Sequence, residues 1–147
     1  MKNLLFGSIL LVVTSSVFAI PNVWIDNFDH GEFHLSIRSD KNYYLAIGCY
    51  QGHDPVDSQF VRVKTDKTYT LNTEGKRDDL QFLINDKKVF VPSLRNQTYS
   101  DVANWNTFLT SLSTAKKIEV FNNNILLMLV TPRNPSEAES LEGCFLN

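Results

Sequence analysis

The chain has 147 residues, of which 43% are hydrophobic and 20% charged, with 14 Lys and Arg residues against 16 Asp and Glu residues and two cysteines. These values are typical of one compact domain, and they exclude a collagen-like, coiled-coil, disordered or disulfide-dense chain. The near-neutral charge also argues against a general nucleic-acid-binding protein, which has a basic excess.

The first nineteen residues have the pattern of a secretory signal peptide. Lys2 gives a positive start, an apolar run covers residues 4–13, and small residues end the segment at Ala19. Cleavage is expected between Ala19 and Ile20, which leaves residues 20–147 as one globular domain with 13 basic and 16 acidic residues, a formal charge of −3. The apolar run is shorter than the roughly 20 residues of a membrane-spanning helix. We predict a periplasmic or secreted bacterial protein without a membrane span.

The two cysteines both lie in the predicted exported part. An exported protein with two cysteines is expected to pair them, so we predict a Cys49–Cys144 disulfide. A bridge between residues so far apart contributes about 4 to 5 kcal/mol in the chain-entropy model. The alternative is a nucleophilic or redox cysteine, but the chain has no CxxC motif, and an oxidising compartment would consume a lone thiol.

Apolar and polar residues alternate through the first two thirds of the exported part. This period of two predicts strands with one buried face. In one of them the alternation places Cys49 on the inward face with aliphatic neighbours. Strands are expected at residues 33–38, 43–50, 60–63, 68–71, 80–84 and 89–91.

After Pro92 the period of the pattern changes, and an amphipathic helix is expected over about residues 101–115. The apolar residues at helical spacing are Trp105, Phe108, Leu109 and Leu112. Two more strands are expected at residues 118–121 and 125–130. The second of these is apolar at every position, so we predict that it lies in the middle of the sheet, covered on both faces, and is the best-protected strand.

The C-terminal part is expected to form a short helix over about residues 137–142. Ser136 and Glu139 match a capping box before it, and Gly143 suits its end, so this helix delivers Cys144 to its partner. The elements together predict an α+β fold. Its main part is an antiparallel sheet of about seven to eight strands, arranged as a sandwich or a partly closed barrel.

The chain contains no phosphate-binding, zinc-protease or nucleophile-elbow motif. His30 and His34 lie in a stretch that alternates like a strand, and in a strand residues four apart stand about 13 Å apart. They are therefore interpreted as surface histidines beside acidic residues and not as metal ligands. His53 beside Asp54 could act as a general base, but no serine or threonine in an elbow accompanies it. We therefore predict no catalytic residue, no metal site and no cofactor.

Aromatic residues are the remaining candidates for a functional surface, since Tyr and Trp are over-represented in the centres of binding interfaces. The strand face that carries Tyr44 and Tyr50 can be core or exposed. The possible binding face comprises Tyr44, Tyr50, Trp24, Phe28 and His53.

The order of parts in the second half of the chain resembles a known family. A hairpin ends in Val-Phe-Val-Pro at residues 89–92, a helix carries Trp105-x-x-Phe108-Leu109, a strand pair follows, and residues 136–141 lead into Gly143-Cys144. This layout resembles the small exported bacterial proteins related to invasion-associated locus B. The resemblance implies a small extracytoplasmic β-rich protein without catalytic residues, and it adds no site residue.

Two classes of function remain in view. The first is an exported, periplasmic, non-enzymatic binding protein that acts through protein–protein contact, such as an inhibitor, an immunity factor or a host-interaction factor. The alternative is a small periplasmic hydrolase with a noncontiguous site of a histidine, such as His53, and a carboxylate. The expected partner is another protein and not a nucleic acid.

Overall fold

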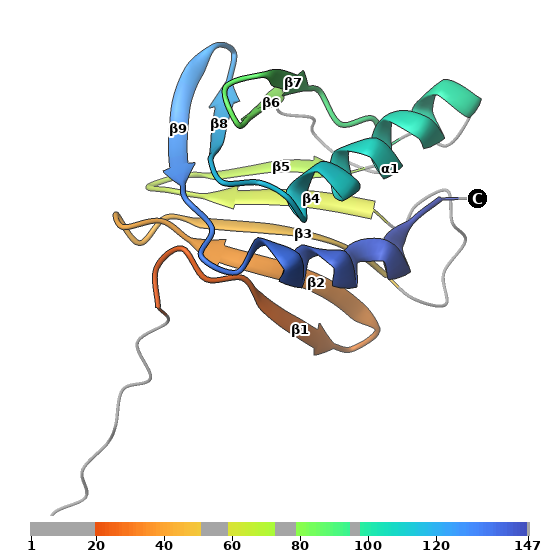
Figure 1. Cartoon of the computed structure of the whole chain (residues 1–147), viewed down its shortest axis with the longest axis horizontal. Helices are drawn as coiled ribbons and strands as arrows, with labels where there is room; N and C mark the ends of the chain where they lie inside the picture. Colours follow the sequence, from red (N-terminus) through yellow and green to blue (C-terminus); the bar gives the residue numbers. More distant parts are fainter. Residues whose placement is uncertain (1–19, 51–58, 73–78, 95–97, 147) are drawn as a thin grey trace, which may run out of the picture.

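The computed structural model describes residues 20–50, 59–72, 79–94 and 98–146, and it has two antiparallel sheets and two helical segments (Figure 1). The first sheet contains β1 (Ile25–Asp29), β2 (Glu32–Arg38), β3 (Tyr44–Tyr50), β4 (Gln59–Lys64) and β5 (Thr68–Asn72), in that order. The second has the order β7 (Lys88–Phe90), β6 (Leu80–Ile84), β8 (Ile118–Asn122) and β9 (Ile125–Val130). The helical segments are α1 (Tyr99–Leu112) and the 3-10 helix η2 (Pro135–Cys144).

The predicted α+β class is confirmed, with two differences in the strands. Neither sheet closes into a barrel within the described residues, and there are nine strands where seven to eight were expected. The additional strand is β1, whose residues are mostly exposed on both faces. An edge strand of this kind shows no alternation of apolar and polar residues, so the period of the sequence could not reveal it.

Residues with positive φ form the tight turns between consecutive strands. Asn123 and Asn124, at φ 48° and 64°, connect β8 to β9 as a two-residue hairpin loop. His30 and Gly31 do the same between β1 and β2. Two consecutive residues with positive φ give the type I′ turn that matches the twist of the strands, and Asn and Gly tolerate this conformation best.

Helix α1 presents the predicted apolar stripe to the core. Its buried residues are Trp105, Phe108, Leu109 and Leu112. The helix begins two residues earlier than expected because Thr98 caps it, and the side chains of Thr98 and Asp101 form a reciprocal capping box. The ring of Phe108 lies 4.9 Å from that of Phe82 and 5.7 Å from that of Phe90, so α1 covers the inner face of the four-stranded sheet.

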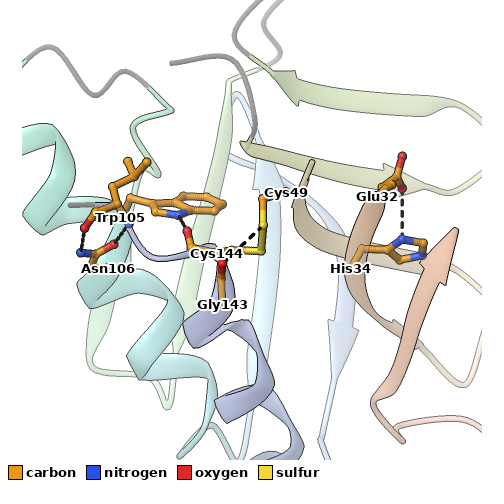
Figure 2. Close-up of a disulfide and its surroundings, with 8 residues drawn as sticks. Glu32, His34, Cys49, Trp105, Asn106, Gly143 and Cys144 are labelled. Atoms are coloured by element: carbon orange, nitrogen blue, oxygen red, sulfur yellow. Dashed lines mark hydrogen bonds and ion pairs between the residues drawn. A yellow bond between two sulfur atoms is a disulfide. The ribbon is translucent and has the colours of Figure 1, made fainter. Parts of the chain in front are cut away.

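The predicted disulfide between Cys49 and Cys144 is confirmed, with the two Cα atoms 5.6 Å apart. Figure 2 shows the bridge beside Trp105, whose indole Nε1 donates a hydrogen bond of 3.0 Å to the carbonyl oxygen of Cys144. Asn106 binds both backbone groups of Leu146, at 2.8 and 2.9 Å. The end of the described chain is therefore held by β3 and by α1.

The prediction for residues 125–130 is wrong in its placement. Strand β9 is the edge of the four-stranded sheet and pairs only with β8 among the described strands. Met128 and Val130 point into the core at 3% and 1% exposure, whereas Leu126 and Leu129 are 50% and 43% exposed. The uniform apolar run therefore reflects one buried face and one exposed apolar face.

Asn22 joins the end of β9 to the five-stranded sheet. Its backbone nitrogen donates to the carbonyl oxygen of Arg38 at 2.7 Å, and its side-chain oxygen accepts from the backbone nitrogen of Thr131 at 3.0 Å. Its side-chain nitrogen donates to Asp40 at 2.9 Å, and its carbonyl oxygen accepts from the nitrogen of Arg133 at 2.8 Å. These bonds place β9 beside the turn between β2 and β3.

Candidate functional site

The face of the four-stranded sheet that points away from α1 is unusually apolar, and we call it the outer face. Strand register brings Leu83 opposite Val89 on one side and Glu119 on the other, and Glu119 opposite Leu129. Phe121 lies opposite Leu126 in the next row. The apolar residues of the outer face are Leu83, Val89, Val91, Phe121, Leu126 and Leu129, with Gln81 and Glu119 between them.

Water reaches much of this apolar surface. Val89 is 62% exposed and Val91 54%, in addition to the two exposed leucines of β9. An antiparallel sheet with one face in water normally places polar residues on that face. Large exposed apolar patches on folded proteins often mark interaction sites, so this face is the candidate contact surface.

The outer face continues to an open sheet edge at β9. Ile125, at the start of this strand, is 68% exposed. A hollow of about 290 Å³ lies along the strand, between residues 126–129 and the turn at Ser39–Lys41. An edge strand with unpaired backbone groups can accept another extended chain, and proteins usually protect such an edge with charged residues, which β9 lacks.

Lysines gather at the end of the outer face where β6 turns into β7 and α1 runs into β8. Asn85 joins the two loops, because its side-chain oxygen accepts from the backbone nitrogens of Lys116 and Lys117 at 2.7 and 3.1 Å. The charged residues of this end are Lys87, Lys88, Lys116 and Lys117 against Asp86 and Glu119. Hydrogen bonds to both carboxylates raise the pKa of Lys117. The end is therefore positively charged within a mildly acidic chain.

A polar and aromatic cluster occupies the opposite side of the molecule, on the five-stranded sheet. Nδ1 of His34 lies 3.0 Å from a carboxylate oxygen of Glu32, and its Nε2 lies 3.2 Å from the hydroxyl of Tyr44. Nδ1 meets Glu32 at ion-pair distance but without the geometry of a hydrogen bond. The His34 side chain is only 15% exposed, so it is not the solvated surface histidine that the sequence led us to expect.

Tyr50 belongs to the same cluster. Its ring lies 5.7 Å from that of Phe60, which is buried at 2% exposure although it points away from the main core. The Arg62 guanidinium stacks on Phe60 at 5.1 Å and lies 3.9 Å from Glu32. Burial, together with the hydrogen bond to the Glu32 carboxylate, raises the pKa of the Tyr50 phenol. Most polar groups of the cluster therefore have their partners within the cluster itself.

The structure separates the five residues of the predicted binding face. Tyr44 and Tyr50 share the outward face of β3, whereas Trp24 lies in the core at 3% exposure, so its side chain is not available to a partner. Phe28 is 66% exposed on edge strand β1, and its register with Phe33 places it on the other side of the sheet. His53 and the predicted cleavage position at Ala19 lie outside the described residues.

The outer face of the four-stranded sheet was missed in the sequence. Part of the signal was present, because Leu83, Val89 and Phe121 each stand next to a buried apolar residue of the same strand. In residues 125–130, apolar side chains on both faces were interpreted as burial on both faces. The structure shows that α1 covers only the inner face of the four-stranded sheet and that β9 lies at its edge. The outer face is therefore left uncovered by these elements.

These observations define a small disulfide-linked α+β domain with an open apolar sheet face. A sequence model of the YfjT family matches residues 22–138, and the chain belongs to this family. No curated protein and no solved structure gave a significant match. The family name states no activity, and the resemblance to the invasion-associated locus B proteins stays a prediction. No helix of the described residues is long and apolar enough to cross a membrane.

Proposed function

We propose that this protein is an exported, non-enzymatic binding protein that acts through protein–protein contact, and that the outer face is its contact surface. The observation that carries the proposal is the exposure of Val89, Val91, Leu126 and Leu129 on one face of the four-stranded sheet. Burying such aliphatic side chains contributes roughly 25 cal/mol per Å² of apolar area. A partner that covers the face gains this free energy.

Charge and shape define the chemistry of the partner. The exposed Lys87, Lys88 and Lys116 at one end of the outer face complement carboxylates that border an apolar patch on the partner. The absence of charges on the exposed edge of β9 suits direct contact with another chain. An inhibitor or immunity factor that blocks an enzyme, or a host-interaction factor, would use a surface of this kind.

Export to the periplasm or the medium is part of the proposal. A disulfide between Cys49 and Cys144 persists in oxidising compartments and is rare in the cytosol. The signal-peptide pattern of residues 1–19 agrees with this location.

The proposal predicts opposite results for two matched variants of residues 20–147. Leu129→Lys places a charge on the outer face, and Ile25→Lys places one on edge strand β1 of the other sheet, where the native residue is similarly exposed (43% and 40%). A partner captured from a periplasmic extract and then purified should bind wild type and Ile25→Lys with equal Kd, and Leu129→Lys at least about tenfold more weakly. Both variants should keep their stability within about 0.5 kcal/mol, since both sites are exposed. Equal binding by Leu129→Lys and wild type would contradict the proposed surface.

A second candidate function rests on the Glu32–His34–Tyr44 contacts. A carboxylate, an imidazole and a hydroxyl follow one another as in hydrolases, although the hydroxyl here is a phenol. We expect that wild type and His34→Gln hydrolyse p-nitrophenyl acetate at the same slow rate. A wild-type rate about 100-fold higher than that of His34→Gln, which is the size of a general-base contribution, would favour the hydrolase.

A further inference from the structure

Two cations, Arg38 and Lys64, lie on the outward face of the five-stranded sheet. Strand register places Arg38 and Lys64 on either side of Tyr44, in one row across β2, β3 and β4. Two strand spacings of about 4.8 Å separate their Cα atoms by about 10 Å. Among the described residues, no acidic side chain lies within ion-pair distance of either cation, whereas the neighbouring Arg62 contacts Glu32.

A hollow of about 490 Å³ opens between these two cations. It is lined by Arg38, Asn42, Tyr44, Lys64 and Thr65. These side chains offer two positive charges, a carboxamide and the hydroxyl of Thr65, and none of the five is acidic. Like charges that face a shared hollow repel each other, and an anion between them removes this repulsion.

The chain holds the Arg38 guanidinium in position. Its Nη1 donates a hydrogen bond of 3.1 Å to the side-chain oxygen of Asn42, and its Cζ lies 5.4 Å from the centre of the Tyr44 ring. Asn42 is itself fixed in the β2–β3 turn, with φ 61° and a hydrogen bond from its nitrogen to the carbonyl oxygen of Ser39. After the bond to Asn42, the guanidinium still has N–H groups that can donate to an oxoanion. Its planar shape allows it to bind two oxygens of the anion at once.

We infer that the hollow between Arg38 and Lys64 is a binding site for an oxoanion, either a carboxylate or a phosphate group. The guanidinium binds two of its oxygens, and the Lys64 ammonium supplies a second positive charge from the opposite side. The hydroxyl of Thr65 supplies a further donor at the rim of the hollow. This site lies on the other sheet from the outer face, so it does not depend on the proposed protein contact.

The test is a titration of oxidised residues 20–147 at low salt, followed by the amide and side-chain NMR shifts. Sodium phosphate and sodium acetate are the two probes, and acetamide is the uncharged control. We expect saturable shifts at Arg38, Tyr44, Lys64 and Thr65 with at least one anion and none with acetamide. The anion with the lower Kd identifies a phosphate or a carboxylate as the natural group. The absence of saturable shifts with either anion would overturn the inference.

Three variants assign the binding to these side chains. Arg38→Gln and Lys64→Gln each remove one charge and should raise the Kd at least about tenfold. Lys67→Gln removes the same charge from the neighbouring turn outside the hollow and should leave the Kd within about twofold. If Arg38→Gln does not fold, Lys64→Gln at its exposed position carries the test alone. An unchanged Kd in Lys64→Gln, or an equal loss in Lys67→Gln, would show that the anions bind only through the general surface charge.

Discussion

Replacing Cys49 and Cys144 together with alanine is expected to lower the free energy of unfolding by about 3 to 5 kcal/mol. The bridge joins residues 95 apart in the sequence, so it restricts a large part of the unfolded chain. It also holds η2 against β3, next to the hydrogen bond between Trp105 and the carbonyl oxygen of Cys144. Urea unfolding followed by tryptophan fluorescence measures the change.

Reduction of the wild-type protein separates the effect of the crosslink from that of packing. Both cysteines are buried, at 4% and 3% exposure, so alanine also removes two packed sulfur atoms. Reduced wild type keeps these atoms and should lose most of the same free energy. A loss below about 1 kcal/mol in both samples would mean that the contacts of α1 with η2 hold the C-terminal segment without the bridge.

Gly48→Ala is expected to destabilise the protein by about 3 kcal/mol, at the upper end of the usual cost of overpacking. A Cβ at this position would collide with the carbonyl oxygen of Phe33 and lie 2.6 Å from the Cβ of His34. The first of these is a backbone atom of the paired strand β2, so the collision cannot be relieved by a side-chain rotation. The strands have to separate locally, or His34 has to leave its place beside Glu32 and Tyr44.

Gly143→Ala is the matched control, because Gly143 is exposed in η2 and its φ is not positive. We expect this variant to change the free energy of unfolding by no more than about 0.5 kcal/mol. Thermal unfolding of both variants, with the His34 ring resonances as a local probe, distinguishes the two sites. Equal stability of the two alanine variants would show that β2 and β3 adjust to the added methyl group.

Local patterns in the sequence predicted most elements, and the arrangement of those elements was harder to predict. The helical spacing of Trp105 and Phe108 identified α1, and the cysteine count identified the disulfide, because one periodicity or one pairing decides each of them. Strand β9 lies at the edge because no further described strand pairs with its free side. The residues of β9 do not specify whether such a strand is present. An apolar run at an open edge therefore has the same sequence as one in the centre of a sheet.

The candidate sites depended even more on three-dimensional context. Alternation placed Tyr44 on the face of β3 opposite Cys49, but it left open whether that face is core or exposed. Its contacts with Arg38 and His34 come from the neighbouring strand β2 and follow only from the register. Trp24 was predicted on the binding face, but its side chain is buried in the core. Exposure of a single aromatic residue cannot be read from its neighbours in the sequence.

The disulfide can form only after both cysteines have been synthesised, and Cys144 is synthesised long after Cys49. All strands of the five-stranded sheet end by Asn72, but Cys144 is synthesised 72 residues later. At roughly 5 to 20 residues per second, this delay lasts about 4 to 14 s. Until Cys144 follows, the thiol of Cys49 has no other cysteine of the chain to pair with. Any premature partner of that thiol, such as a small disulfide in the surroundings, has to be exchanged before Cys144 can take its place.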